Sequence, residues 1–341
     1  MGRDTVRILL VADTHLGFDL PFRPRIHRRR RGKDFFSNFD VALQPAMRGE
    51  VDLVVHGGDL FFRSKVPAAL VEMSMAPLIR VAESGVPVCL VPGNHERSRI
   101  PLYLWGTHPN LHILDSPRTF HFQIRDMSVA LAGFPFKRLI RDAFVQLVSE
   151  TNHRDNQADL RILCIHQTVE GSRVGPSDYV FRRGPDVITG SDIPSGFAAV
   201  LSGHIHRSQM LTHDLAGIPL ASPVIYPGSV ERTSFAERNE EKHYVLLDFM
   251  SNRDSGGDLR QVDFVPLPAR PMVKLDLKVD GLHGESLEEF LKDQFKAIDP
   301  EAVLRLHIHG PVSSEAMLKL NAKHLRSIAP PTMNVSIRFA Q

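Results

Sequence analysis

Five short polar segments of this 341-residue sequence carry carboxylate, amide and imidazole side chains, and each follows an apolar run. Such side chains hold divalent metal ions, and a pair of ions can promote the cleavage of phosphate esters. Each segment alone is a weak signal, but all five in this order make a strong one. The segments are Asp13-Thr14-His15, Gly57-Gly58-Asp59, Gly93-Asn94-His95-Glu96, His166-Gln167 and Gly203-His204-Ile205-His206.

The spacing within these segments suggests shared ligands. Asp13 and His15 are two residues apart, and His204 and His206 repeat that spacing. In extended backbone, residues i and i+2 point to the same face, so Asp13 and His15 could bind one ion. Asp59 follows two glycines that permit a tight turn, and its carboxylate could bridge two ions. Taken singly, each has an ordinary alternative, such as an aspartate that caps a turn.

The joint placement of the segments decides between these interpretations. Asn94 offers an amide oxygen, His95 could be a ligand or a proton donor, and His166 ends another apolar run. Side chains at the carboxyl ends of strands meet at one edge of an α/β sheet, where ligands bind. A purely structural explanation would need five independent coincidences. We therefore interpret the five segments as a binuclear metal site.

Apolar runs and helical periodicities predict the elements that position these residues. Strands are expected at 6–12, 51–55, 86–91 and 159–166, and helices at 33–48, 67–84 and 137–150. Runs at 111–114, 119–125 and 128–132 predict a mixed or antiparallel extension of this sheet. Runs at 197–202, 209–213, 224–226 and 244–249 predict a second sheet, and residues 171–185 a mobile loop. The expected fold class is α/β, a two-sheet sandwich flanked by helices.

A break at 251–258 and three following prolines predict a domain boundary, with a first domain at 1–265 and a small α+β domain at 266–341. The second is expected to have strands at 273–279, 303–309 and 334–339, and a helix at 313–327. A capping box of Ser286 and Glu289 is expected to open another helix. His307 and His309 lie on a polar strand face without a neighbouring carboxylate motif, so we expect them to face solvent or nucleic acid.

Composition limits the partners and the compartment. The formal net charge is +2, so attraction to nucleic acid must come from local patches. Residues 23–33 form one such patch, in which Arg25, Arg28, Arg29, Arg30 and Arg31 are expected to contact phosphates; a solvated loop is the alternative. Two cysteines in apolar runs predict inert core thiols and a reducing, cytoplasmic compartment. No run is long enough to span a membrane, so no membrane partner is expected.

The five segments resemble those of the calcineurin-like metallophosphoesterase superfamily over roughly the first 250 residues. The resemblance implies that Asp13, His15 and His206 bind one ion and that Asn94, His166 and His204 bind the other. It further implies that Asp59 bridges the ions and that His95 is a catalytic residue that protonates the leaving group. Two divalent metal ions are expected, and manganese is favoured.

A narrower resemblance is to the SbcD-type DNA repair exonucleases. It rests on HLGFD, GGDLFF, GNHE, LSGHIHRSQ and YPGSVERTSFAE, and on a tail that is similar to that family's capping domain. It implies hydrolysis of DNA phosphodiester bonds. Known members often have Asp where Glu96 stands. Members that bind an SMC-like ATPase use helices beyond the cap, and this sequence shows none after 334–339, which argues against that partner.

Other interpretations predict different functions. The enzyme could act on a phosphoprotein or a cyclic nucleotide, although the basic run and the tail domain argue against this. A non-catalytic scaffold of a DNA complex is a second alternative, but such scaffolds lose ligands and here all are present. Met73, Met75 and residues 102–105 could form a homodimer surface, and core packing explains them equally well.

Overall fold

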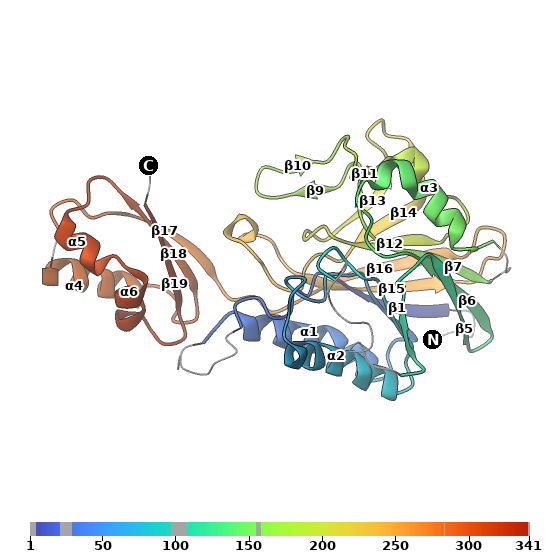
Figure 1. The fold of residues 1–341 in the computed structure, drawn as a ribbon, viewed down its shortest axis with the longest axis horizontal. Coiled ribbons are helices and arrows are strands. Elements are labelled where there is room, and N and C mark those ends of the chain that lie inside the picture. Colours follow the sequence, from blue (N-terminus) through green and yellow to red (C-terminus); the bar gives the residue numbers. More distant parts are fainter. Residues whose placement is uncertain (1–4, 21–28, 97–107, 155–157, 283, 340–341) are drawn as a thin grey trace. The chain divides into compact units, whose positions relative to one another are not determined.

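The structure, a computed structural model, describes residues 5–20, 29–96, 108–154, 158–282 and 284–339 (Figure 1). The chain forms two compact units. Unit 1 comprises Met1–Phe18, Phe35–Thr233 and Glu240–Leu267, and unit 2 comprises Asp19–Asp34, Ser234–Asn239 and Pro268–Gln341. Unit 2 thus draws two short segments from far earlier in the sequence. That unit 2 acts as a capping domain stays a prediction.

Unit 1 contains two six-stranded sheets. The first has the order β16 (Asp258–Pro266), β15 (His243–Met250), β1 (Thr5–Val11), β2 (Leu53–His56), β3 (Val88–Leu90) and β4 (Leu111–Ile113). The second has the order β13 (Gln209–His213), β14 (Pro219–Tyr226), β12 (Ala199–Gly203), β7 (Leu160–His166), β6 (Met127–Gly133) and β5 (Arg118–Ile124). Strands β1 to β4 are parallel, as are β6, β7, β12 and β14.

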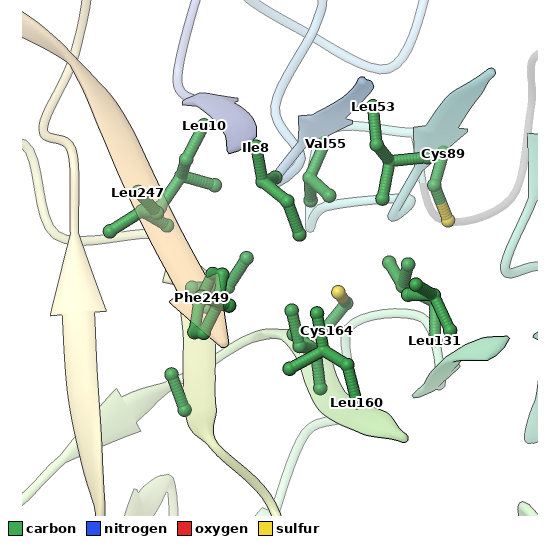
Figure 2. Packing of buried hydrophobic residues seen from close by; sticks show 14 of the residues in the cluster. Ile8, Leu10, Leu53, Val55, Cys89, Leu131, Leu160, Cys164, Leu247 and Phe249 are labelled. Atoms are coloured by element: carbon green, nitrogen blue, oxygen red, sulfur yellow. The ribbon is translucent and has the colours of Figure 1, made fainter. Parts of the chain in front are cut away.

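The inner faces of the two sheets pack against each other. Figure 2 shows Ile8 and Val55 of the first sheet opposite Leu131 and Cys164 of the second. All four side chains are fully buried. Burial of each large aliphatic side chain contributes about 1.5–3 kcal/mol, so this layer is the main source of stability for the sandwich.

Helices cover the outer faces. Figure 1 shows α1 (Gly32–Met47) and α2 (Ala68–Glu83) side by side along the first sheet, and α3 (Ile140–Glu150) beside the second. Phe144 of α3 belongs to a second buried cluster with residues of β7, β12 and β14. The predicted α/β sandwich flanked by helices is therefore confirmed. None of the helices in the described ranges is long and apolar enough to cross a bilayer.

Two predictions about the strands of unit 1 are wrong. The run at 244–249 forms β15 of the first sheet, antiparallel to β1, and not part of the second. The runs at 111–114, 119–125 and 128–132 do not extend one sheet together. Strand β4 pairs with β3 in the first sheet, while β5 and β6 join the second sheet. Within the loop expected at 171–185, β9 (Arg173–Val174) and β10 (Tyr179–Val180) form a short hairpin, and the mobility of this loop stays a prediction. Local patterns reveal a strand but not its neighbour, which depends on contacts distant in sequence.

Smaller elements complete unit 1. Strands β8 (Thr168–Val169) and β11 (Val187–Ile188) pair in parallel beside the second sheet, and a short 3-10 helix follows at Gly190–Asp192. Strand β16 was not predicted, although it pairs along its whole length with β15. Met75 is fully buried in α2, whereas Met73 is half exposed, and residues 102–105 lie outside the described ranges. Core packing accounts for Met75, and the dimer surface stays a prediction.

Unit 2 is a three-stranded parallel sheet in the order β17 (Met272–Lys278), β18 (Val303–His309) and β19 (Asn334–Phe339). Helices α4 (Gly284–Lys296), α5 (Ser314–Lys319) and α6 (Ala322–Ile328) pack on one face of it through a common apolar cluster. A 3-10 helix at Phe235–Glu237 also belongs to this unit.

Three predictions about unit 2 are wrong. Helix α4 begins at Gly284, so Ser286 lies inside it and does not cap it. The single helix at 313–327 is two, because Asn321 caps α6 by accepting hydrogen bonds from the backbone nitrogens of Lys323 and His324, each at 3.0 Å. His307 and His309 do have a carboxylate beside them, because parallel pairing places Asp276 of β17 next to His307.

Candidate metal centre

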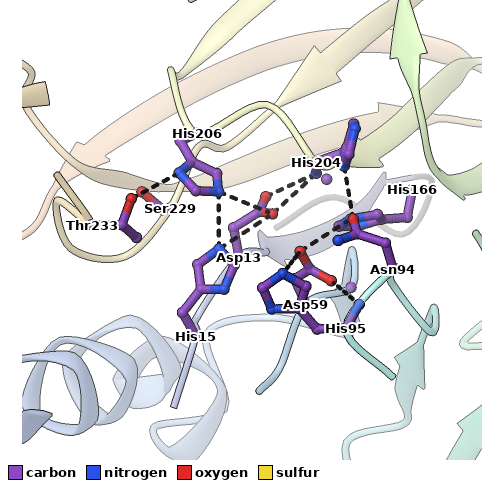
Figure 3. A network of polar contacts seen from close by, with 12 residues as sticks. Asp13, His15, Asp59, Asn94, His95, His166, His204, His206, Ser229 and Thr233 are labelled. Carbon is purple, nitrogen blue, oxygen red and sulfur yellow. Dashed lines mark hydrogen bonds and ion pairs between the residues drawn. The ribbon is translucent and has the colours of Figure 1, made fainter. Parts of the chain in front are cut away.

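The polar segments meet because they follow neighbouring parallel strands. Asp13 follows β1, Asp59 follows β2 and Asn94 follows β3 in the first sheet, while His166 ends β7 and His204 follows β12 in the second. Because parallel strands end at the same edge, both sheets direct these side chains to one place. Figure 3 shows all the predicted ligands and His95 grouped there. The group belongs entirely to unit 1.

The backbone at this edge is strained. Asp13, His15, Asp59 and His204 have φ of 50°, 42°, 51° and 84°, in the left-handed region that non-glycine residues rarely adopt. The expectation that Asp13 and His15 share a face of extended backbone is therefore wrong. They converge because their segment turns beside the Asp59 segment, with backbone hydrogen bonds from Asp13 to Gly58 at 2.8 Å and from His15 to Asp59 at 3.0 Å. Such strain costs about 1–3 kcal/mol per residue and is concentrated at functional sites.

The first group of possible metal ligands, which we call the first donor group, consists of Asp13, His15 and His206. The Nε2 atoms of the two imidazoles are 2.9 Å apart, and both face Oδ1 of Asp13, at 4.0 Å from His15 and 3.9 Å from His206. The carboxylate of Asp13 is itself held by the backbone nitrogen of His204, at 3.1 and 3.0 Å from its two oxygens. Three donors thus converge from two sheets.

Asn94, His166 and His204 form a second donor group. Oδ1 of Asn94 lies 3.2 Å from Nε2 of His166 and 2.9 Å from Nδ1 of His204. The other nitrogen of His166 lies 2.7 Å from the carbonyl oxygen of Gly57, and since only an N–H can donate to a carbonyl, Nδ1 carries the hydrogen. Nε2 therefore faces the site, where it can bind a metal ion once it has lost its own proton.

Asp59 lies between the two groups. Its Oδ2 is 3.6 Å from Nε2 of His166 and 3.9 Å from Nε2 of His95. It belongs to one potential metal-binding set with Asp13 and His166 and to another with His15 and His95. Asp59 is almost fully buried, so its position is set by packing and by its neighbours.

His95 is partly exposed, with 31% of its side chain accessible, as is His206 with 29%. Its Nδ1 lies 3.0 Å from the carbonyl oxygen of Phe61, which fixes that nitrogen as the donor and leaves Nε2 facing the site. Its backbone nitrogen donates to Oδ1 of Asp59 at 2.9 Å. The imidazole is therefore oriented independently of any ligand.

The charges in the site favour a cation. Burial, together with neighbouring histidines, lowers the pKa of His15 and of His204 to about 3, so both imidazoles are neutral with lone pairs available at pH 7. Burial raises the pKa of Asp13 to about 6. Burial lowers the pKa of His166, but the charge of Asp59 outweighs it and raises this pKa to about 9. His166 would therefore release a proton when a metal ion binds. Neutral imidazoles and buried carboxylates suit divalent transition metals, so the donor set fits such ions.

Glycines make the close approach possible. A side chain at Gly58, which has φ of 104°, would collide with the ring of His166, and one at Gly93 would collide with the carboxylate of Asp59. These glycines bring backbone directly against the donor groups.

Two residues outside the predicted site brace it. Nδ1 of His56 accepts a hydrogen bond from the nitrogen of Gly58 at 3.2 Å, which leaves Nε2 to donate to Oγ1 of Thr14 at 3.1 Å. His56 is fully buried, and these two hydrogen bonds give it a role beyond packing. Lys242, 1% exposed, donates to the carbonyl oxygen of His206 at 2.9 Å. The apolar surroundings of His56 concealed its role, and Lys242 carried no signal because its partner is distant in sequence.

The arginine segment is described only in part, since Arg25 and Arg28 lie outside the described residues. In unit 2, Arg29 contacts Asp34 at 2.9 Å and Glu301 at 2.8 Å, and Arg30 forms an ion pair with Asp19. Arg31 is largely buried. These ion pairs reduce the positive charge that Arg29 and Arg30 offer, and their contact with nucleic acid stays a prediction.

Comparison with known proteins agrees with the site. Residues 6–208 match the calcineurin-like phosphoesterase family. The chain is 24% identical to the DNA double-strand break repair protein Mre11 of Methanocaldococcus jannaschii, over 84% of this chain and 74% of that protein. It is 27% identical to the protein of the same name from Saccharolobus solfataricus, over 95% of this chain and 80% of that protein. The matched family segment covers more than half of the sequence and contains every predicted ligand, and the chain therefore belongs to the calcineurin-like phosphoesterase family.

Proposed function

We propose that this protein is a metal-dependent nuclease that hydrolyses phosphodiester bonds in DNA, with two divalent ions, manganese by preference, as its cofactors. The observation that carries the proposal is the pair of donor groups joined through Asp59. One group would hold one ion through Asp13, His15 and His206, and the other would hold the second through Asn94, His166 and His204. Asp59 would be shared.

The bound ions would supply positive charge for the phosphoryl oxygens and lower the pKa of a water molecule. The protein's own part is to hold the donors before substrate arrives. The strained turns at Asp13 and Asp59 and the cross-sheet contact of His15 with His206 achieve this. Preorganised charge is effective because no reorganisation is needed during the reaction.

His95 is suited to protonate the leaving oxygen. Nδ1 of His95 donates its hydrogen bond to the carbonyl oxygen of Phe61. The proton to be transferred would therefore reside on Nε2, the atom that faces Asp59. The partial exposure of this ring leaves room for a substrate to approach it. The ring of His166 is, by contrast, fully buried between Gly57 and Asn94, as suits a ligand.

DNA is favoured as substrate by two observations. The relatives at 24% and 27% identity are named as DNA double-strand break repair proteins, and alignment with them extends over most of this chain. The basic segment at 23–33 offers groups that position a phosphate backbone. We further propose that unit 2 acts as a capping domain.

The test is a nuclease assay on end-labelled duplex and single-stranded DNA with added manganese, in parallel with bis-p-nitrophenyl phosphate, a phosphopeptide and a cyclic nucleotide. We expect cleavage of DNA that is lost with chelator and in Asp59→Ala. Cleavage of the small diester without any of DNA would support a phosphoesterase of another substrate class. Unchanged DNA cleavage in Asp59→Ala would contradict the assignment of the site.

A further inference from the structure

A second cluster of metal-binding side chains lies within unit 2, on strands β17 and β18. The parallel register pairs Asp276 with His307 and Lys278 with His309. His307 and His309 are two residues apart on one strand, so both side chains are on the same face as Asp276. Helices α4 to α6 cover the apolar side chains of this sheet, whereas the side chains of the three cluster residues are 25% to 50% exposed.

The imidazoles converge on one oxygen. Oδ1 of Asp276 lies 2.8 Å from Nδ1 of His307 and 2.7 Å from Nε2 of His309. The ring centroids of His307 and His309 are 4.5 Å apart, and the two ring planes are nearly perpendicular. The possible ligand atoms of the three residues all lie within 4.8 Å of one another. Zn–N distances of about 2.0–2.1 Å correspond to ligand atoms about 3.3 Å apart in a tetrahedral site. Exposed side chains can open by the remaining half ångström.

The carboxylate of Asp276 lies at the centre of the cluster and makes it suited to bind a cation and not an anion. An anion would have to displace Asp276 from both imidazoles. A cation would take the place of the two hydrogen-bonded protons, which can move to the other ring nitrogens, and would be held by all three groups. Two imidazoles and one carboxylate suit zinc and similar divalent transition metals. We propose that Asp276, His307 and His309 form a metal site for a zinc-class divalent ion, separate from the centre in unit 1. Bound metal would join β17 to β18 across their exposed face.

Lys274 would compete with a bound metal ion for the carboxylate of Asp276. Its Nζ lies 3.0 Å from Oδ1 of Asp276, in the region that a bound cation would share. Its side chain is 40% exposed and flexible, so it can move into solvent when metal binds. The site is therefore expected to bind metal reversibly, and removal of this lysine is expected to strengthen binding.

Equilibrium dialysis of the full chain against zinc tests the proposal, with bound zinc per chain as the readout. We expect His307→Asn combined with His309→Asn to weaken one binding event by at least about tenfold, because even outer partners of a metal ligand contribute about 10–100-fold. Lys274→Gln should strengthen the same event by about fivefold, as expected for one charge removed beside a cation in water. The unit 1 centre contributes equally to all these proteins.

His213→Asn is the matched control, because His213 is an exposed strand histidine outside the cluster, and it should bind zinc as the native chain does. Asp276→Ser is a second cluster variant and should behave as the double histidine variant if the latter folds poorly. Equal zinc binding by the native chain and by both cluster variants would overturn the proposal. Weaker binding in Lys274→Gln would do the same, since it would make the cluster only an ion-pair network.

Discussion

The carboxylate of Glu96 accepts a hydrogen bond from the backbone nitrogen of Asp59 at 3.1 Å and thereby ties two of the ligand-bearing turns together. The same carboxylate accepts from the nitrogens of Phe61 at 2.9 Å and Gly93 at 2.7 Å. Glu96 is 5% exposed, and burial together with the charge of Asp59 raises its pKa to about 8. The motif residue that seemed a minor departure is thus a brace for the metal centre.

We expect Glu96→Ala to lower the free energy of unfolding by about 1–3 kcal/mol, because it leaves buried N–H groups without an acceptor. Activity should fall as well, since Asp59 loses its support. Urea unfolding and the nuclease assay would measure the two effects. Glu96→Asp is the matched variant, with the same carboxyl group on a shorter side chain, and should retain more of both. Full activity and stability in Glu96→Ala would refute the bracing role.

Gly58→Ala should disrupt the second donor group. The new Cβ would overlap the ring of His166, so that ring must move and metal binding should weaken. Gly85→Ala is the control, because Gly85 has φ of 94° but nothing within 4 Å of a Cβ. Both variants carry similar backbone strain, but only Gly58→Ala should lose metal, as measured by elemental analysis of the purified proteins. Equal metal contents would contradict this explanation.

His95→Asn should reduce DNA cleavage by about 10²–10⁴-fold while metal binding is retained, because general acid catalysis contributes on that order. The structure supports the separation, since His95 lies at the edge of the donor groups and its Nδ1 is bound to Phe61. Cleavage rates and bound metal would be measured on the same preparation. A variant without either metal ion would show that His95 is a ligand instead.

Arg25→Gln combined with Arg28→Gln should weaken binding to duplex DNA. If both residues contact phosphates, the slope of log affinity against log salt should become shallower by about 1.8, at about 0.9 for each phosphate. Arg29 should contribute less, because its guanidinium is paired with Asp34 and Glu301. Arg80→Gln on α2 is the control and should leave the slope unchanged. An unaltered slope in the double variant would exclude this positioning role.

Asp159 should make stability depend on pH. Burial raises its pKa, but hydrogen bonds from Ser128 and Arg253 outweigh burial and lower it from 3.8 to about 2. The stabilisation, about 1–2 kcal/mol after screening by solvent, is therefore complete above pH 4 and is lost as pH falls toward 2. Asp159→Asn should be less stable than the native chain at pH 6, and the gap should shrink at pH 2.5. Urea unfolding at both pH values measures it, and a constant gap would contradict the assignment.

The part of the site that could be predicted is the part that depends on local sequence patterns and not on contacts between residues distant in sequence. A polar residue after an apolar run is a local pattern, so the predicted ligands and the strand ends that carry them could be read from the sequence. The roles of His56 and Lys242 could not, because their partners Thr14 and His206 lie 42 and 36 residues away in the sequence. The placement of β15 beside β1 also escaped prediction, since alternation shows which residues are buried but not the neighbouring strand.

The sequence by itself determined the residue types of the candidate metal centre, the α/β class and the positions of most strands along the chain, because these depend on local periodicity and on the polar residues at the end of each apolar run. The family resemblance implied how the donors divide into two groups, and the tertiary structure gives the physical reason. His204 and His206 are two residues apart, yet one contacts Asn94 and the other His15, because the left-handed turn at His204 directs them to different groups. Only strand pairing brought Asp276 beside His307, because such contacts are made by folding and have no trace in the local sequence.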